Sequence, residues 1–196
     1  TSTALGDQGR PPASERVVTG YLGVGPRGLL NVREQLSCPD AQVVAVCDVN
    51  TASHGYLRES QYLGREPAKK QVETFYAAKS RSGTYRGCDA YNDFRELLAR
   101  DDIDAVFIGT PDHWHSKIVI DALKAGKDVQ CQKPLTLTID EGKQICKVVK
   151  ETGKILHIGT QQRSENRSMF LKAVVLALSG RLGKKLTATC SIGGGP

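Results

Sequence analysis

The sequence has no long apolar run, no closely spaced cysteine pair and few aromatic residues. No apolar run approaches the ~20 residues that a membrane helix needs, so we expect no membrane contact. The six cysteines are widely spaced, without a Cys-x-x-Cys pair; this gives no support for disulfides or a metal site and favours a reducing compartment. The net charge of +6 comes from basic residues scattered among acids, which is typical of a solvated surface and not of a nucleic-acid-binding patch.

A glycine-rich turn is the most informative feature that is present. The short apolar run 17–22 leads into Gly23-Val24-Gly25-Pro26-Arg27-Gly28, and residues 29–36 are compatible with a helix. We expect Gly23 to allow a tight turn, Gly25 to let the backbone approach phosphates, and Gly28 to let helix and strand pack closely. The helix N-terminus would add free N–H donors and the positive end of a dipole. This order predicts a binding site for a dinucleotide pyrophosphate.

An acidic residue completes the pattern. Residues 41–47 form the next apolar run, and Asp48 ends it 20 residues after Gly28. A carboxylate at this place can accept hydrogen bonds from the adenosine ribose hydroxyls. Because it would repel a 2′-phosphate, it favours NAD over NADP as the cofactor. The alternative is a ligand-free strand–helix turn with a surface aspartate.

Apolar runs alternate with helix-compatible segments up to Gly159. This alternation predicts an α/β fold with a doubly wound parallel sheet, a Rossmann dinucleotide-binding domain. We expect Asn92 to cap a short helix, and Thr138 to begin, with a capping box, a helix that Gly153 ends. The expected strands are residues 17–22, 41–47, 88–91, 103–109, 128–131 and 155–158, and the expected helices are residues 29–36, 51–80 with an interruption near Gly64 and Pro67, 93–99, 116–125 and 139–152.

The two ends of the chain differ from this central part. Residues 1–16 are polar and rich in Gly, Pro and Ser, which predicts a flexible arm or the remnant of an export signal. The compartment is therefore open between cytoplasmic, which the cysteines favour, and exported. We place the dinucleotide-binding domain at residues 17–163. Residues 164–196, with an apolar helix at 169–178 and an alternating strand at 186–192, are expected to begin a truncated second α/β domain.

Polar and aromatic residues gather at three further strand ends, at residues 110–115, 132–134 and 159–163. Ligands of open parallel sheets bind at the carboxyl ends of the strands, so we expect these segments to line one cleft. Trp114 and His115 either lie beside the nicotinamide and its ribose or serve in turn packing and helix capping. A metal pair formed by two histidines of this segment would lack a third ligand.

Lys133 and Arg163 are the charged candidates of this cleft. Held between a strand end and Pro134 in a partly desolvated cleft, Lys133 is a candidate to donate or accept a proton at a substrate hydroxyl; the alternative is a surface lysine. Arg163, beside Gln162, either orients an anionic or polyhydroxylated substrate or makes an ion pair within its loop.

Four motifs together resemble the Gfo/Idh/MocA family of oxidoreductases, which includes glucose–fructose oxidoreductase and inositol dehydrogenase. They are Gly23-Val24-Gly25-Pro26-Arg27-Gly28, Thr110-Pro111-Asp112-His113-Trp114-His115, residues 125–134 with Gln132-Lys133-Pro134 at their end, and Gly159-Thr160-Gln161-Gln162-Arg163. The turn Gly180-Arg181-Leu182-Gly183 is similar to the family's entry into its second domain. The resemblance covers about residues 17–196, which is nearly the whole chain.

The resemblance implies a Rossmann domain for NAD(P), followed by a mostly antiparallel α/β domain that holds substrate and makes the full-length protein a homo-oligomer. It implies that Lys133, in the family's Glu-Lys-Pro motif, is the catalytic lysine. Gln132 departs from the family's Glu, and the lost negative charge is expected to let Lys133 give up its proton more easily. The implied cofactor-binding residues are Gly23, Gly25, Pro26, Arg27, Gly28, Asp48, Thr110, Pro111, Trp114, His115, Gln132 and Lys133, and the substrate contacts are Gln162 and Arg163.

Three functions are compatible with this resemblance. The first is an NAD(H)-dependent oxidoreductase that transfers hydride between nicotinamide and a sugar, cyclitol or related polyol. The second is an NAD-dependent glycoside hydrolase of the same family, which would use the same cofactor site. The third is a dinucleotide-binding protein without catalysis, which Gln132 favours. The family's further catalytic residues lie in its second domain, so we expect this chain to bind cofactor without turnover.

Overall fold

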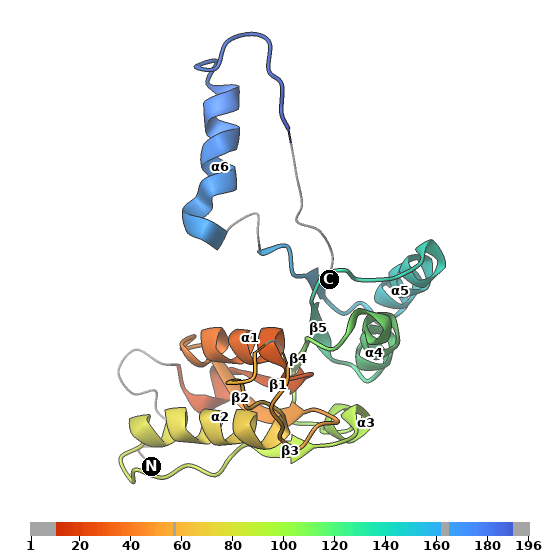
Figure 1. Cartoon of the computed structure of the whole chain (residues 1–196). Helices are drawn as coiled ribbons and strands as arrows, with labels where there is room; N and C mark the ends of the chain where they lie inside the picture. Colours follow the sequence, from red (N-terminus) through yellow and green to blue (C-terminus); the bar gives the residue numbers. More distant parts are fainter. Residues whose placement is uncertain (1–10, 57, 162–164, 190–196) are drawn as a thin grey trace. The chain divides into compact units, whose positions relative to one another are not determined.

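The structure is a computed structural model that describes residues 11–56, 58–161 and 165–189 (Figure 1). The chain divides after Gly159 into two units, Thr1–Gly159 and Thr160–Pro196. Every strand found in the described residues belongs to the first unit, which therefore contains the whole sheet.

The first unit is built on a six-stranded sheet in the order β3-β2-β1-β4-β5-β6, with every pair parallel. The order reverses between β1 and β4, and ligands of such sheets bind at this switch point. The predicted doubly wound parallel sheet is confirmed. A 3-10 turn, η1 (Ala13–Glu15), precedes the strands β1 (Val17–Leu22), β2 (Ala41–Cys47), β3 (Asp89–Tyr91), β4 (Ala105–Ile108), β5 (Asp128–Cys131) and β6 (Leu156–Ile158), and the connecting helices are α1 (Pro26–Leu36), α2 (Arg65–Lys79), α3 (Phe94–Leu98), α4 (Asp112–Lys124) and α5 (Ile139–Thr152).

Helices cover both faces of this sheet (Figure 1). One buried cluster joins α1 and α2 to the sheet around Tyr21 and Val43, and the other joins α3, α4 and α5 to it around Leu22 and Val106. Successive residues of a strand point to opposite faces, and Tyr21 and Leu22 are accordingly buried in different clusters. Because both faces are covered, the central strands are near-continuous apolar runs.

Three of the expected helices begin later or earlier than the sequence suggested, the first of them, α1, at Pro26 and not at residue 29. The prediction of helix from residue 51 is wrong: Ser53 and Leu63 form an antiparallel bridge, and α2 begins only at Arg65. The Asn50 amide stabilises the loop by donating to Ser53 Oγ at 2.7 Å and to the Tyr56 hydroxyl at 2.8 Å. In the third case, α4 begins at Asp112 and not at residue 116, so the first turn of the helix includes residues 112–115.

The capping signals were mostly predicted well. Thr138 Oγ1 accepts from the Glu141 N–H while the Glu141 carboxylate accepts from the Thr138 N–H, which confirms the capping box. Gly153 ends α5 in the left-handed region, with φ of 66°. The predicted cap of α3 is wrong by one residue: Asp93, and not Asn92, accepts from the Arg95 N–H at 2.9 Å.

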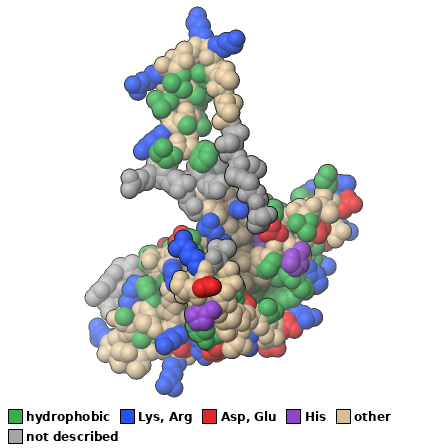
Figure 2. All heavy atoms as spheres, viewed as in Figure 1, with side chains coloured by type: hydrophobic (Ala, Val, Ile, Leu, Met, Phe, Trp, Pro, Cys, Tyr) green, Lys and Arg blue, Asp and Glu red, His purple; other side chains and the backbone are tan. Residues whose placement is uncertain are grey.

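The described part of the second unit is the helix α6 (Glu165–Leu178) and a segment without regular structure. Apolar side chains are exposed along α6, as Figure 2 shows, and Leu178 is 84% exposed. Residues 186–189 of the expected strand are not paired, and residues 190–192 lie outside the described residues. The strand and the second domain therefore stay predictions. In the part of the chain that the structure describes, every helix is too short or too polar to span a bilayer.

Candidate functional site

The glycine turn between β1 and α1 is as tight as its sequence predicts. Gly23 has a φ of +84°, and a Cβ atom there would lie 2.6 Å from the backbone nitrogen of Thr110. A Cβ atom on Gly28 would lie 1.9 Å from the carbonyl oxygen of Gly23. Only glycine fits at these two positions, because the backbones of the turn, the helix and β4 touch one another.

The N-terminus of α1 faces the same turn. Gly25 is the N-cap residue, Pro26 follows as the first residue of the helix, and no described side chain caps this end. The first backbone N–H groups of a helix lack partners within it and carry the positive end of the helix dipole. This end of α1 can therefore bind an anion.

Asp48 lies directly after β2 and is tied to the glycine turn. Its Oδ2 accepts from the Val24 N–H at 2.9 Å, and its Oδ1 accepts from the Asn50 N–H at 2.9 Å. Each carboxylate oxygen has a second lone pair, so the group can still accept hydrogen bonds from a ligand. The backbone fixes where these oxygens lie.

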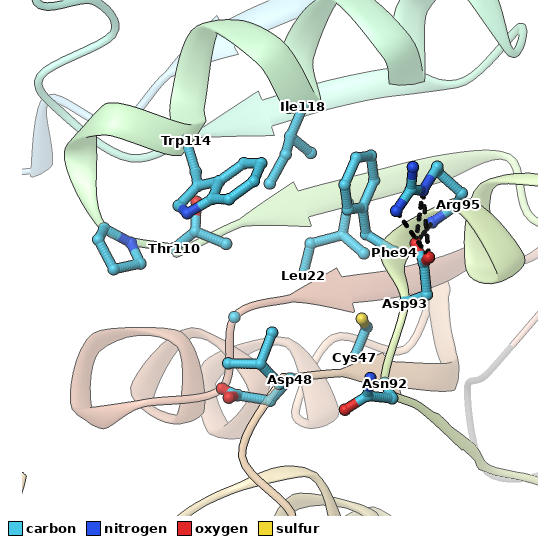
Figure 3. Close-up of a pocket in the computed structure, with 13 residues that line it drawn as sticks. Leu22, Cys47, Asp48, Asn92, Asp93, Phe94, Arg95, Thr110, Trp114 and Ile118 are labelled. Atoms are coloured by element: carbon cyan, nitrogen blue, oxygen red, sulfur yellow. Dashed lines mark hydrogen bonds and ion pairs between the residues drawn. The ribbon is translucent and has the colours of Figure 1, made fainter.

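A cavity of about 320 Å³ opens beside Asp48 at the carboxyl ends of β1, β2 and β4 (Figure 3). Its walls are mostly apolar, and Figure 3 shows Trp114 and Ile118 of α4 opposite Asp48 and Cys47. The buried hydroxyl oxygen of Thr110 has no hydrogen-bond partner among the described residues. The lining residues are Leu22, Gly23, Cys47, Asp48, Val49, Asn92, Asp93, Phe94, Arg95, Thr110, Pro111, Trp114 and Ile118.

Three titratable groups of the cavity wall have shifted pKa values: Cys47, Asp93 and Arg95, whose pKa is raised by its hydrogen bond to Asp93. Hydrogen bonds from Arg95, at 2.9 and 3.1 Å, lower the pKa of Asp93, so this carboxylate stays ionised (Figure 3). Burial raises the pKa of the Cys47 thiol to about 12, and the thiol is therefore protonated and unreactive near neutral pH.

His115 is buried, at 1% exposure, and bridges two turns. Its Nδ1 lies 2.6 Å from the carbonyl oxygen of Pro134, and its Nε2 lies 2.9 Å from that of Thr110. Both partners are acceptors, and a neutral imidazole has one N–H, so the ring donates to one carbonyl and packs against the other, between the turn after β4 and the turn after β5. Trp114, in contrast, is 46% exposed and lies edge-on to Phe94, with 6.5 Å between ring centroids.

The turn after β5 does not reach the cavity. Gln132 is buried, whereas Lys133 is exposed. The partial desolvation expected of Lys133 therefore stays a prediction, since its side chain is exposed among the described residues. Among the predicted site residues, Gly23, Asp48, Thr110, Pro111 and Trp114 line the cavity. Gly25, Pro26, Arg27, Gly28, His115, Gln132 and Lys133 do not, and Gln162 and Arg163 lie outside the described residues.

Several residues near the site were missed in the sequence. Asn92, Phe94 and Arg95 reach the cavity from the β3–α3 connection. Tyr56 lies over the glycine turn, since a Cβ atom on Gly25 would be 3.3 Å from its ring. In any sheet of this topology the short strand β3 ends beside β2. Its position alone would have indicated that Asn92, Phe94 and Arg95 lie near the site. Nothing in the local sequence indicates Tyr56, because its segment resembled a helix.

The described residues give no support for a metal pair at the two histidines of α4. No group of three or more His, Cys, Asp or Glu side chains in the described ranges lies where it would hold a metal ion.

A parallel sheet with a glycine turn at its switch point and an acidic residue at the end of β2 defines a dinucleotide-binding Rossmann domain. Residues 17–160 match the model of the Gfo/Idh/MocA family, an oxidoreductase family with an NAD-binding Rossmann fold. The chain belongs to this family, as its motifs predicted.

Relatives with quite different activities share this domain. The α-N-acetylgalactosaminidase of Shewanella oneidensis is 33% identical over 143 residues, which are 73% of this chain and 28% of that protein. The chain thus spans little more than a quarter of this curated relative's length.

Two solved structures are similar in fold. Scyllo-inositol dehydrogenase of Lactobacillus casei, with bound NAD(H) and scyllo-inositol, has a TM-score of 0.64 at 23% identity over 86% of this chain and 42% of that one. A 3-ketoreductase of Actinomadura kijaniata, in complex with TDP-benzene and NADP, has a TM-score of 0.65 at 19% identity over 86% of this chain and 46% of that one. At these identities they show the shared fold.

Proposed function

We propose that the chain binds NAD, with the adenosine half of the cofactor in the cavity beside Asp48. The observation that carries this proposal is the Asp48 carboxylate, which the Val24 and Asn50 N–H groups hold at the cavity while leaving lone pairs for the ribose hydroxyls. The apolar walls suit an adenine ring. In this arrangement Trp114 contacts the adenine, since it shares the cavity with Asp48.

The pyrophosphate would lie at the N-terminus of α1. Gly25 has no side chain to separate its backbone from a ligand there. Pro26, Arg27 and Gly28 form the first turn of the helix. The free N–H groups and the helix dipole favour the two negative charges. NAD is preferred over NADP in this proposal because the Asp48 carboxylate would repel a 2′-phosphate.

The activity proposed is oxidoreduction of a sugar, cyclitol or related polyol. When bound, the nicotinamide accepts or donates the hydride. Lys133 is the residue proposed to exchange a proton with the substrate hydroxyl, and His115 holds its turn in place through the Pro134 carbonyl.

A second candidate is an NAD-dependent glycoside hydrolase, favoured by the curated relatives named as glycosidases. The two candidates differ in their products. NADH formation from NAD⁺ and a polyol supports the dehydrogenase, whereas cleavage of an aryl glycoside without net NADH supports the hydrolase. These reactions are measured with the full-length protein, because this chain alone is expected to bind the cofactor without turnover. Binding of NAD by the full-length protein without either reaction, even after Gln132→Glu, supports a non-catalytic dinucleotide-binding protein.

The binding proposal is tested by calorimetric titration of the chain with NAD⁺ and NADP⁺. We expect NAD⁺ to bind more tightly than NADP⁺, and Asp48→Ala to weaken NAD⁺ binding by about tenfold or more, because the ribose loses a charged acceptor. Asp40→Ala is the matched control, since Asp40 is exposed in the turn before β2. Equal NAD⁺ affinity in both variants, or no binding by a folded chain, contradicts the proposal.

A further inference from the structure

Arg65 connects the carboxyl ends of two neighbouring strands. Its Nη1 donates to the carbonyl oxygens of Asp48 at 3.0 Å and Val49 at 3.2 Å, which directly follow β2. The same nitrogen donates to Oδ1 of Asn92, which directly follows β3, at 3.1 Å. All three acceptor residues line the cavity, whereas Arg65 itself does not.

The N-terminus of α2 is built to place this side chain. Gly64, the N-cap residue, has a φ of +134°, and a Cβ atom there would lie 2.7 Å from the Thr51 carbonyl oxygen. This close approach lets the Arg65 N–H donate to the Asn50 carbonyl at 3.0 Å and the Glu66 N–H donate to that of Thr51 at 3.1 Å. These backbone hydrogen bonds fix the N-terminus of α2 to the segment after β2, independently of the Arg65 side chain.

Few other interactions hold the two strand ends together. The last backbone bond between them runs from the Asp48 N–H to the Tyr91 carbonyl at 3.1 Å. Beyond it, in the described residues, the Arg65 guanidinium makes the side-chain link from residues 48 and 49 to Asn92. Hydrogen bonds from a charged donor are stronger than neutral ones, so this link fixes the side of the cavity that Asp48 and Asn92 share.

We propose that Arg65 is a positioning residue for the adenosine half of the cofactor, acting through the backbone of Asp48 and Val49 and the side chain of Asn92. This inference rests on the proposed binding of NAD. It predicts that Arg65 affects affinity without touching the ligand, because it holds the backbone after β2, which carries the Asp48 carboxylate, next to Asn92.

The test is calorimetric titration of the chain with NAD⁺ in three variants. Arg65→Met removes the donor at similar length and is expected to weaken NAD⁺ binding about tenfold. Arg65→Lys keeps a charged donor at the same place and is expected to recover most of the affinity. Arg58→Met is the control for charge. Arg58 is exposed in the preceding loop, and its substitution removes the same positive charge.

The outcomes separate this inference from the proposed function. Failure of the folded parent chain to bind NAD⁺ overturns both. Tight binding by the parent, with Arg65→Met no weaker than Arg58→Met, overturns the role of Arg65 alone. An equal loss of NAD⁺ affinity in Arg65→Met and Arg65→Lys also overturns it. The proposed role needs a charged donor at this position, so a variant that keeps such a donor should bind NAD⁺ better than one that lacks it.

A second variant covers the case in which Arg65→Met does not fold. Asn92→Ala leaves Arg65 bound to the end of β2 and removes only its contact to the β3 end. We expect this exposed substitution to leave the unfolding midpoint unchanged and to weaken NAD⁺ binding several-fold. Unchanged NAD⁺ affinity in Asn92→Ala overturns the link between the two strand ends.

Discussion

The two edges of the sheet carry similar polar residues and use them differently. At the amino edge, carboxylates bind the backbone of neighbouring strands: Asp104 Oδ2 accepts from the Val18 N–H at 2.7 Å, and Asp128 Oδ1 accepts from the Ile155 N–H at 2.9 Å. At the carboxyl edge, Asp48 and Thr110 border a cavity, and the Thr110 hydroxyl is unpartnered in the described residues. The difference between the two edges is thus the cavity beside Asp48 and Thr110, whereas Asp104 and Asp128 bind backbone N–H groups.

The amino edge is held further by a cluster of charges. Arg100 donates to Asp102 at 2.6 Å and to Asp89 at 2.8 Å, and Lys127 Nζ donates to the Arg100 carbonyl. These contacts lower the pKa of Asp102 through its hydrogen bond from Arg100. These side chains are paired with one another or with the backbone, so they stabilise the fold at this edge.

The largest expected loss of stability comes from a substitution at the carboxyl edge, at Gly28. Gly28→Ala places a Cβ atom against the Gly23 carbonyl, so α1 must move away from β1. We expect a loss of about 3 kcal/mol in the free energy of unfolding, the upper part of the range for overpacking. Urea denaturation measures it.

Gly142→Ala is the matched control for this change. Gly142 lies in α5, and its Cβ would approach only Thr136 Oγ1, at 3.9 Å. Alanine is the better helix former, so this variant should gain about 0.5–1 kcal/mol. Equal stability of the two variants would mean that the glycine turn is not tightly packed.

An intermediate effect is expected at His115, which connects two turns of the same edge. His115→Leu removes the ring N–H that donates to the Thr110 or the Pro134 carbonyl, and leaving that buried acceptor unpaired is expected to cost about 2 kcal/mol. His113→Leu, on the exposed side of α4, should change stability by less than about 0.5 kcal/mol. If His115→Leu unfolds at the same urea concentration as the parent, the bridge has no structural role.

The smallest expected loss of stability comes from a substitution at the amino edge, at Asp104, which tests whether the two edges act independently. Asp104→Ala removes the acceptor of the Val18 N–H and should cost about 1 kcal/mol in unfolding free energy. NAD⁺ affinity should stay within about twofold of the parent, because the two edges are distant and share no partners. Asp101→Ala, exposed in the turn before β4, is the control for charge. A large loss of NAD⁺ affinity in Asp104→Ala would show that the edges are coupled.

The sequence predicted those parts of the site that depend on local geometry. The spacing of Gly23, Gly28 and Asp48 follows from a strand, a turn and a helix in succession, and the structure has these elements at that place. Thr138 and Glu141 were predictable for the same reason, since a capping box needs only four consecutive residues.

The parts that depend on distant contacts were not predictable. Residues 51–64 have helix-compatible composition, yet the Asn50 amide and the close approach of Gly64 hold them as a loop. This error also hid Tyr56 and Arg65. The early start of α4 had a usable signal, because Pro111 followed by Asp112 is typical of a helix N-terminus. With that boundary, His115 would have been placed in the helix's first turn.

The position of Trp114 gives the chain a built-in optical probe. It is the only tryptophan in the sequence, and its ring lies half-exposed in the cavity wall. Long-wavelength ultraviolet light excites tryptophan selectively. In this chain it therefore excites a single indole, which lies where the ligand is expected to bind. Its emission overlaps the absorption of reduced nicotinamide, so energy transfer would report occupancy directly. Binding can thus be followed in the unmodified chain, without a label and without knowledge of the substrate.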